Sequence, residues 1–203
     1  MCGRFRLEIS PKDIIGFYKL IEQIDKKYKR EQEIIQATMN KDHYPGSVTA
    51  AIKGEGVASM LWGFPLDKKL VFNGRSESLD EKMMFKNLIA SNRCLIPASL
   101  FYEWKDKKKY TIKTEDPYFF MAGLYRKYRD ENGRDEDRFV ILTTEADQEM
   151  QKIHDRMPVI IDKSQLGAYL DAATPKAAVK SFYQPWNRGL AIELADNEQI
   201  TFF

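Results

Sequence analysis

The chain has 203 residues, of which 43% are hydrophobic and 31% charged, and its formal net charge at pH 7 is +2. This length and composition are typical of one globular domain and exclude a disordered or fibrous chain. The longest apolar stretch, residues 117–125, is too short to span a bilayer, and no signal peptide is visible. With only two cysteines, Cys2 and Cys94, a disulfide framework is not expected, which favours a reducing cytoplasm. We therefore expect a cytoplasmic protein, and the short apolar stretches predict no membrane association.

Apolar residues at helical spacing predict four helices. Ser10 and Pro11 form a helix start, with the serine as N-cap and the proline in the first turn. Ser78 followed by Glu81 is a capping pattern that indicates another start. The helices are expected at residues 11–30, 78–89 and 145–152, and from residue 164 onward.

Short apolar runs bounded by Gly, Pro and charged residues predict strands. These runs lie at residues 48–52, 57–62, 70–72, 94–96, 110–112, 118–125, 139–143, 159–161 and 190–194. Strand follows strand more often than helix, which favours an α+β fold with a largely antiparallel sheet. The charged segment 129–138, with Asn132-Gly133 at its centre, predicts an exposed hairpin tip.

Cys2 stands directly behind the initiator methionine. Removal of Met1 would leave an α-amine and a thiol on adjacent carbons, which is a 1,2-aminothiol. In model compounds the amine titrates near pH ~8 and the thiol near ~8.5, so both supply some nucleophile at neutral pH. The alternative is a small, partly buried residue at the start of a strand, because free cysteines mostly behave as small hydrophobes.

Other polar residues could complete an amine chemistry directed at an aldehyde. Glu103 lies between aromatic residues that could desolvate it, and a histidine such as His154 can share acid and base steps with it. Asn73 can orient a hydroxyl without adding charge. Taken alone, Glu103 could be the exposed position of an alternating strand and His154 could cap a helix end. Arginines near these groups suggest a substrate flanked by phosphates; they are Arg4, Arg75 and Arg156.

Five sequence blocks, read in order, resemble the SOS response-associated peptidase (SRAP) family, whose members shield abasic sites in single-stranded DNA by covalent attachment. The blocks are MCGRF, NGRSES, RCLIPASLFYEWK, TTEAD and HDRMPVII, and they extend from residue 1 to residue 161. The resemblance implies a single compact α+β domain over residues 1–203, with a curved, barrel-like, mainly antiparallel sheet flanked by helices.

The resemblance also implies a covalent chemistry. After autoproteolytic removal of Met1, the α-amine of Cys2 would form a Schiff base with the aldehyde of an abasic sugar, and the thiol would close a thiazolidine. Glu103 would manage protons on the amine and assist Met1 removal. His154 would act in sugar-ring opening and in reversal of the crosslink, and Asn73 would position the sugar.

The expected partner is single-stranded DNA containing abasic sites, bound by a monomer that joins the nucleoid if the host is prokaryotic. The residues that the resemblance assigns to DNA are Thr143 near the lesion, Arg4, Arg75 and Arg156 on phosphates, and Trp62 and Phe64 as a wedge against stacked bases. No cofactor is expected. No metal is expected either, because the cysteines and histidines lack metal-ligand spacing.

Two other functions remain open at this point. One is a thiol peptidase that uses Cys2 against other proteins, and the other is a non-catalytic domain that binds single strands. Cys94 is expected to be a buried thiol, and His43 to be structural or solvent-facing. The basic run at residues 105–109 could extend a DNA groove or form a solvated hairpin.

Overall fold

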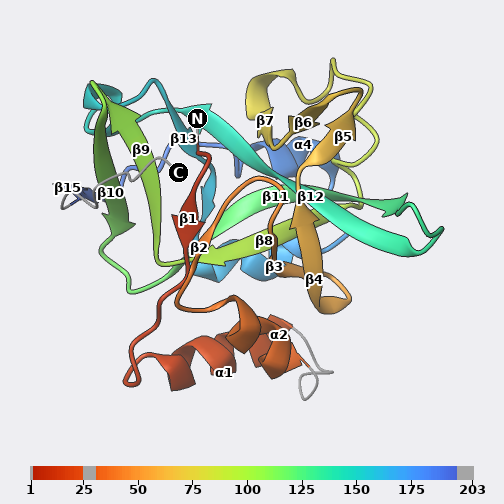
Figure 1. Cartoon of the computed structure of the whole chain (residues 1–203), viewed down its shortest axis with the longest axis horizontal. Coiled ribbons are helices and arrows are strands. Elements are labelled where there is room, and N and C mark those ends of the chain that lie inside the picture. The colour runs from red at the N-terminus through yellow and green to blue at the C-terminus, as the bar shows by residue number, and fades with distance from the viewer. Residues whose placement is uncertain (1, 25–30, 196–203) are drawn as a thin grey trace.

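The computed structural model describes residues 2–24 and 31–195. Two sheets dominate these residues (Figure 1). In the first sheet, every pair of neighbouring strands is antiparallel. Its strands, in spatial order, are β15 (Leu190–Leu194), β10 (Lys108–Thr114), β9 (Leu100–Lys105), β1 (Phe5–Arg6) and β2 (Asp42–His43).

Five strands of the second sheet close into a barrel. Each strand pairs with the next, and the last pairs with the first. The barrel strands, in spatial order, are β12 (Asp135–Glu145), β4 (Gly56–Trp62), β3 (Val48–Lys53), β8 (Arg93–Ala98) and β11 (Phe119–Arg129). The β12–β4 pair is parallel and the other four are antiparallel, so the α+β fold with a barrel-like, mainly antiparallel sheet is confirmed.

Short strands extend the barrel at its rim. β7 (Asn73–Arg75) and β13 (Arg156–Pro158) pair with β12, and β14 (Ile160–Ile161) pairs with β11. β5 (Phe64–Leu66) and β6 (Lys69–Val71) form a separate hairpin. Two candidate site segments, those of Asn73 and Arg156, therefore lie next to the same strand.

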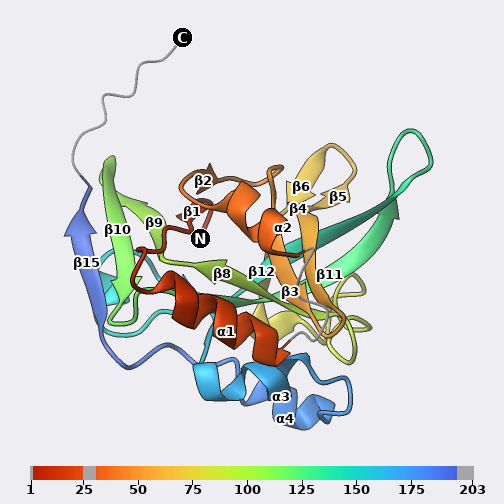
Figure 2. The same ribbon diagram turned by 90° about the horizontal axis from the view of Figure 1, so that it is seen from below.

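The helices are α1 (Ile14–Ile24), α2 (Glu31–Thr38), α3 (Leu166–Leu170) and α4 (Lys176–Lys180), with 3-10 helices at Ser76–Ser78, Met150–Lys152 and Lys163–Gln165. Helix α2 packs against β3 and β4 and α3 packs against β8, while α1, α3 and α4 lie on the same side of the molecule in Figure 2. Among the described residues no helix is long and apolar enough to cross a membrane.

The barrel strands bury both of their faces, which explains their nearly continuous apolar sequences. Along β3, Ala50 and Ile52 join one hydrophobic cluster and Ala51 joins the other. The first cluster is covered by helices through side chains such as Phe17 of α1. The second is covered by the five-stranded sheet and includes Phe5 and Phe101. Strand β1 thereby carries the start of the chain into the interior.

The predicted strands all overlap observed strands, and the charged hairpin tip is confirmed. The turn between β11 and β12 is held by the carboxylate of Asp130, which accepts hydrogen bonds from the amides of Asn132 and Arg134 at 2.8 Å each. Gly133 occupies the left-handed region at φ 74°, which suits the Asn-Gly signal.

The helix predictions were less accurate. Residues 79–91 form turns rather than a helix, and the hydroxyl oxygen of Ser78 is buried with no hydrogen-bond partner among the described residues, so the predicted cap bond is not made. Strand β12 continues through Glu145, so only a 3-10 turn follows it. The first helix begins at Ile14, and its predicted last residues, 25–30, lie outside the described residues.

Candidate functional site

Cys2 lies just before β1 and is fully buried in the second cluster. Phe5 of β1 pairs with Phe101 of β9, and the amide of Tyr102 donates to the carbonyl of Arg4 at 2.9 Å, so the pairing continues toward the chain start. Extending this antiparallel register places Glu103 next to the residues that precede Arg4. The main chain therefore brings Cys2 and Glu103 together.

Burial and neighbouring charges shift the ionisation of both Cys2 and Glu103. Burial raises the pKa of the Cys2 thiol, and the Glu103 carboxylate raises it further. Burial also raises the pKa of Glu103, while the charge on a protonated His154 would lower it. The thiol is therefore protonated at neutral pH, and Glu103 accepts protons at a higher pH than an ordinary glutamate does.

Asn73 holds the backbone of Cys2. Its side-chain Nδ2 donates to the Cys2 carbonyl at 2.9 Å, and its main chain is fixed by the pairing of β7 with β12. Its Oδ1 is buried and has no hydrogen-bond partner among the described residues. A buried acceptor left unpaired is uncommon in folded proteins, and a hydroxyl of a bound molecule would satisfy it.

His154 follows a 3-10 turn and has a partner for its ring in either protonation state. Nδ1 lies 2.9 Å from the amide of Arg156 and 2.8 Å from a carboxylate oxygen of Asp155. One nitrogen cannot accept from the amide and donate to the carboxylate at the same time. The neutral ring accepts from Arg156, and the protonated ring donates to Asp155. This arrangement suits a group that gives and takes protons.

Arg4 is occupied by protein groups. Its Nε donates to Asp42 at 2.6 Å, its Nη2 pairs with the same carboxylate oxygen, and its guanidinium lies 4.9 Å from the ring centres of both Tyr44 and Tyr102. Asp42 also accepts from the hydroxyl of Tyr102 at 3.1 Å. The carboxylate of Asp42, which the sequence did not single out, therefore joins β2 to β1 and β9 beside the chain start.

Arg156 is likewise paired, whereas Arg75 is exposed. Arg156 is buried and binds both carboxylate oxygens of Glu77 at 2.9 Å, together with the carbonyl of Thr143 at 2.7 Å. Arg75 lies opposite Thr143 in the β7–β12 pairing. A cavity of about 310 Å³ opens beside these groups; Arg75, Glu145, Gln151, Asp155 and Arg156 line it.

Trp62 and Phe64 do not form the predicted wedge, because both rings are fully buried. The indole Nε1 of Trp62 donates to the carbonyl of Phe72 at 2.8 Å, and the ring stacks on Phe139. Phe64 packs against other core rings. Gly63 between them donates its amide to Phe139 at 2.7 Å, which holds the segment onto β12. Neither ring can reach a base in this conformation.

The remaining residues that the sequence singled out have structural roles. His43 is buried, stacks on Phe5, and has Nε2 2.8 Å from the carbonyl of Thr38, and burial lowers its pKa. Cys94 is a buried thiol as expected. The basic run after Trp104 forms the exposed β9–β10 turn, with positive φ at Asp106.

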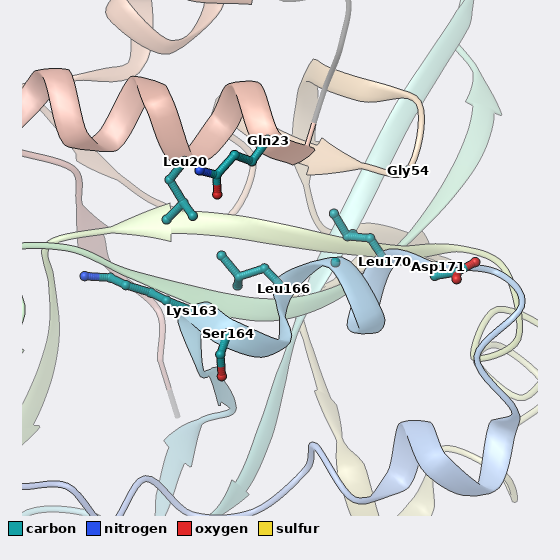
Figure 3. Close-up of a pocket in the computed structure, with 9 residues that line it drawn as sticks. Leu20, Gln23, Gly54, Lys163, Ser164, Leu166, Leu170 and Asp171 are labelled. Carbon is teal, nitrogen blue, oxygen red and sulfur yellow. The ribbon is translucent and has the colours of Figure 1, made fainter.

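Metal ligation has no support in the described part of the chain, where no cluster of three or more His, Cys, Asp or Glu side chains could hold a metal ion. A cavity of about 440 Å³ lies between α1 and α3, lined by Leu20, Gln23, Leu166 and Leu170 among others (Figure 3). It contains none of the candidate residues.

Comparison with known proteins identifies the family to which this chain is similar. The model of the SOS response associated peptidase (SRAP) family matches residues 1–196. The abasic site processing protein YoaM of Bacillus subtilis is 32% identical over 79% of this chain and 75% of its own length. The abasic site processing protein YoqW of Bacillus phage SPbeta is 30% identical over 92% of this chain and 88% of its own.

Solved structures agree on the fold. A crystal structure of a protein from Bacteroides thetaiotaomicron superposes with a TM-score of 0.79 at 21% identity, covering 95% of this chain and 91% of the other. One from Bordetella bronchiseptica gives 0.75 at 22% identity, covering 97% and 100%. With a family model that matches nearly the whole sequence, this chain belongs to the SOS response associated peptidase (SRAP) family.

Proposed function

We propose that this protein processes abasic sites in single-stranded DNA by forming a covalent crosslink through Cys2. The observation that carries the proposal is the convergence of Cys2, Asn73 and Glu103, with His154 near enough to act on the ionisation of Glu103. These residues come from distant parts of the sequence. Relatives named as abasic site processing proteins support the lesion as the substrate.

The crosslink needs Cys2 as the first residue, so Met1 must be removed first. Met1 lies outside the described residues. Glu103 is the carboxylate suited to this step, because the register places it beside the start of the chain and burial raises its pKa, which makes it a stronger base than an ordinary glutamate. We propose that the same carboxylate serves both the processing and the later crosslinking.

The crosslink then forms in two steps. The α-amine of Cys2 loses a proton to Glu103 and attacks the aldehyde carbon of the open abasic sugar, forming a C–N bond. An acid, His154 or the protonated Glu103, donates a proton to the hydroxyl, which leaves as water and gives a Schiff base. The thiol then adds to the imine carbon and its proton passes to the ring nitrogen. One aldehyde and one aminothiol thus give a thiazolidine and one water.

The order of attack follows from the ionisation of the site. Burial and Glu103 raise the pKa of the Cys2 thiol, so a thiolate is scarce at neutral pH and the amine is the better first nucleophile. The unpaired Oδ1 of Asn73 would accept a hydrogen bond from a sugar hydroxyl. Arg75, exposed at the rim of the 310 Å³ cavity, would bind a flanking phosphate.

The decisive experiment incubates the protein with single-stranded DNA bearing one abasic site and looks for an adduct that survives denaturation. The wild-type protein should form it, Cys2→Ala should not, and Cys94→Ala should form it normally because Cys94 lies within a strand, carries no free α-amine and cannot form a thiazolidine. Intact mass should show loss of Met1. Retention of Met1, or no adduct from a processed terminus, would refute the proposal.

The same protein sample tests the peptidase alternative. Cys2-dependent cleavage of unrelated peptides would favour a general thiol peptidase. The burial of Cys2 does not separate the two functions, because a peptide and an abasic sugar both need access to the nucleophile, so the cleavage assay decides between them.

A further inference from the structure

We infer that Glu77 is a positioning residue, which clamps Arg156 across strand β12 and so fixes His154 relative to Asn73. The inference rests on the proposed function for its catalytic consequence. The clamp itself is a matter of geometry, and it gives Arg156 a positioning role in addition to the phosphate binding that the sequence predicted.

The Glu77–Arg156 contact is a two-point ion pair. Each carboxylate oxygen of Glu77 accepts from a different terminal nitrogen of Arg156, both at 2.9 Å. Nη2 of Arg156 also donates to the Thr143 carbonyl at 2.7 Å. Parallel bonds of this kind fix the plane of the guanidinium as well as its position. The hydrogen bonds to Arg156 also hold the pKa of Glu77 below its usual value against the opposing effect of burial, so the pair is charged at neutral pH.

This ion pair joins two strands that do not touch each other in the sheet. Thr143 of β12 pairs with Arg75 of β7 and with Pro158 of β13. A strand residue has two such partners only on opposite edges, so β7 and β13 flank β12. Glu77 follows β7 by two residues, and Arg156 begins β13. The side chains therefore bridge the strand that separates the two segments.

Each segment carries a reactive-site residue close to its end of the bridge. On one side, Asn73 of β7 donates to the carbonyl of Cys2 at 2.9 Å. On the other, the amide of Arg156 donates to Nδ1 of His154 at 2.9 Å. A shift of Arg156 would therefore move the hydrogen bond that orients the imidazole, whereas Asn73 would stay with β7. A small displacement of a catalytic group lowers the reaction rate strongly.

The alternative is that Glu77 is a mobile anion that yields its place to a DNA phosphate. The burial of Arg156 argues against this alternative. Its side chain is 9% exposed, and its Nε is buried without a hydrogen-bond partner among the described residues, so the guanidinium is turned away from solvent. A phosphate entering the 310 Å³ cavity would meet the exposed Arg75 first.

The test compares Glu77→Gln with Glu136→Gln. Glutamine keeps the shape of Glu77, but its amide NH2 replaces one acceptor oxygen with a donor, so the two-point contact with the guanidinium is lost. Glu136 is the matched control, because it pairs with Arg138 on the same strand β12, outside the site. Crosslinking is measured at saturating abasic single-stranded DNA, and DNA affinity is measured separately in a Cys2→Ala background, where no adduct forms.

We expect Glu77→Gln to lower the maximal crosslinking rate by about tenfold or more while DNA affinity changes less than about twofold. Glu136→Gln should match the wild type. Combining Glu77→Gln with Arg156→Gln should be no worse than Arg156→Gln alone, since both remove one interaction. An unchanged crosslinking rate, or tighter DNA binding with faster crosslinking, would overturn the inference; the latter result would make Glu77 a competing anion.

A second readout does not depend on crosslinking. Hydrogen exchange of the Arg156 amide, which donates to His154, should be faster in Glu77→Gln than in the wild type or Glu136→Gln. If the wild type forms no adduct, the proposed function fails while this measurement still decides the clamp. Equal exchange in all three proteins would refute it.

Discussion

Replacing Glu103 by glutamine should make the protein more stable and less reactive at the same time. The carboxylate is 4% exposed, and burial raises its pKa. An acid whose pKa is higher in the folded than in the unfolded state stabilises the fold below its unfolded pKa, and this contribution is lost as pH rises through the folded pKa. At pH 7 and above, the wild type therefore carries a buried charge that glutamine removes.

Both effects follow from this environment. Burial raises the pKa of Glu103, so Glu103→Gln should raise the free energy of unfolding at pH 8, where the wild type holds a buried carboxylate. The gain should vanish below about pH 4, where the unfolded wild type is also protonated. Crosslinking should fall by about 10²- to 10⁴-fold, the usual loss when a general base is removed.

Two assays on the same variant separate these effects. Urea denaturation at pH 4 and pH 8 gives the stability difference, and the rate of adduct formation on abasic single-stranded DNA gives the reactivity. The variant may be compared with wild type only after intact mass has shown whether Met1 is removed from each. A Glu103→Gln protein that is less stable than wild type at pH 8, or that crosslinks at the wild-type rate, would refute the reasoning.

Three further changes test the fold and the interface. Arg93→Met should lower the free energy of unfolding by about 3–5 kcal/mol in urea denaturation, because the buried guanidinium binds the carbonyls of Tyr169, Ile89, Ala90 and Asp171; a loss under 1 kcal/mol would contradict this role. Gly123→Ala should cost about 1–3 kcal/mol, because its Cβ would lie 2.5 Å from Ile96 Cδ1 and 2.9 Å from the Val140 carbonyl oxygen, whereas Gly167→Ala, with nothing within 4 Å, should be neutral or stabilising. Equal effects of the two glycine substitutions would show that packing at Gly123 is not the cause. Arg75→Ala should weaken binding to single strands and reduce the slope of log affinity against log salt by about 0.7, as loss of one phosphate contact requires; an unchanged slope would remove Arg75 from the interface.

The sequence predicted the barrel strands well because each is a long apolar run buried on both faces. The predicted runs did not include β1, β2, β5, β7 and β13, which have two or three residues each, or the six-residue β9, whose sequence mixes aromatic and charged residues. The helix predicted after Ser78 was also wrong. The capping pattern is local, but the fold buries the Ser78 hydroxyl without a hydrogen-bond partner among the described residues, so the cap does not form.

The candidate catalytic residues could be predicted because each lies in a sequence block that resembles the family. Cys2, Asn73, Glu103 and His154 were found from sequence blocks, and the structure places the first three in contact or adjacent register. Contacts made by Asp42 and Glu77 were not predictable, because their arginine partners are distant in sequence. Glu77 stands in the quoted NGRSES block, yet nothing local indicates that it pairs with Arg156.

The position of Cys2 depends on its main chain more than on its thiol. The chain start is held by its backbone: Tyr102 donates to the Arg4 carbonyl at 2.9 Å, Ser99 donates to the Arg6 carbonyl at 2.9 Å, and Asn73 donates to the Cys2 carbonyl at 2.9 Å. None of these bonds uses the thiol, so its chemistry can change without loosening the anchor. A Cys2→Ser variant should therefore keep the fold, with a free energy of unfolding about 1–3 kcal/mol lower because a hydroxyl replaces the thiol in an apolar cluster, and its hydroxyl is a poorer nucleophile toward the imine. Loss of the fold in Cys2→Ser would mean that the sulfur itself, rather than the backbone pairing, holds the start of the chain.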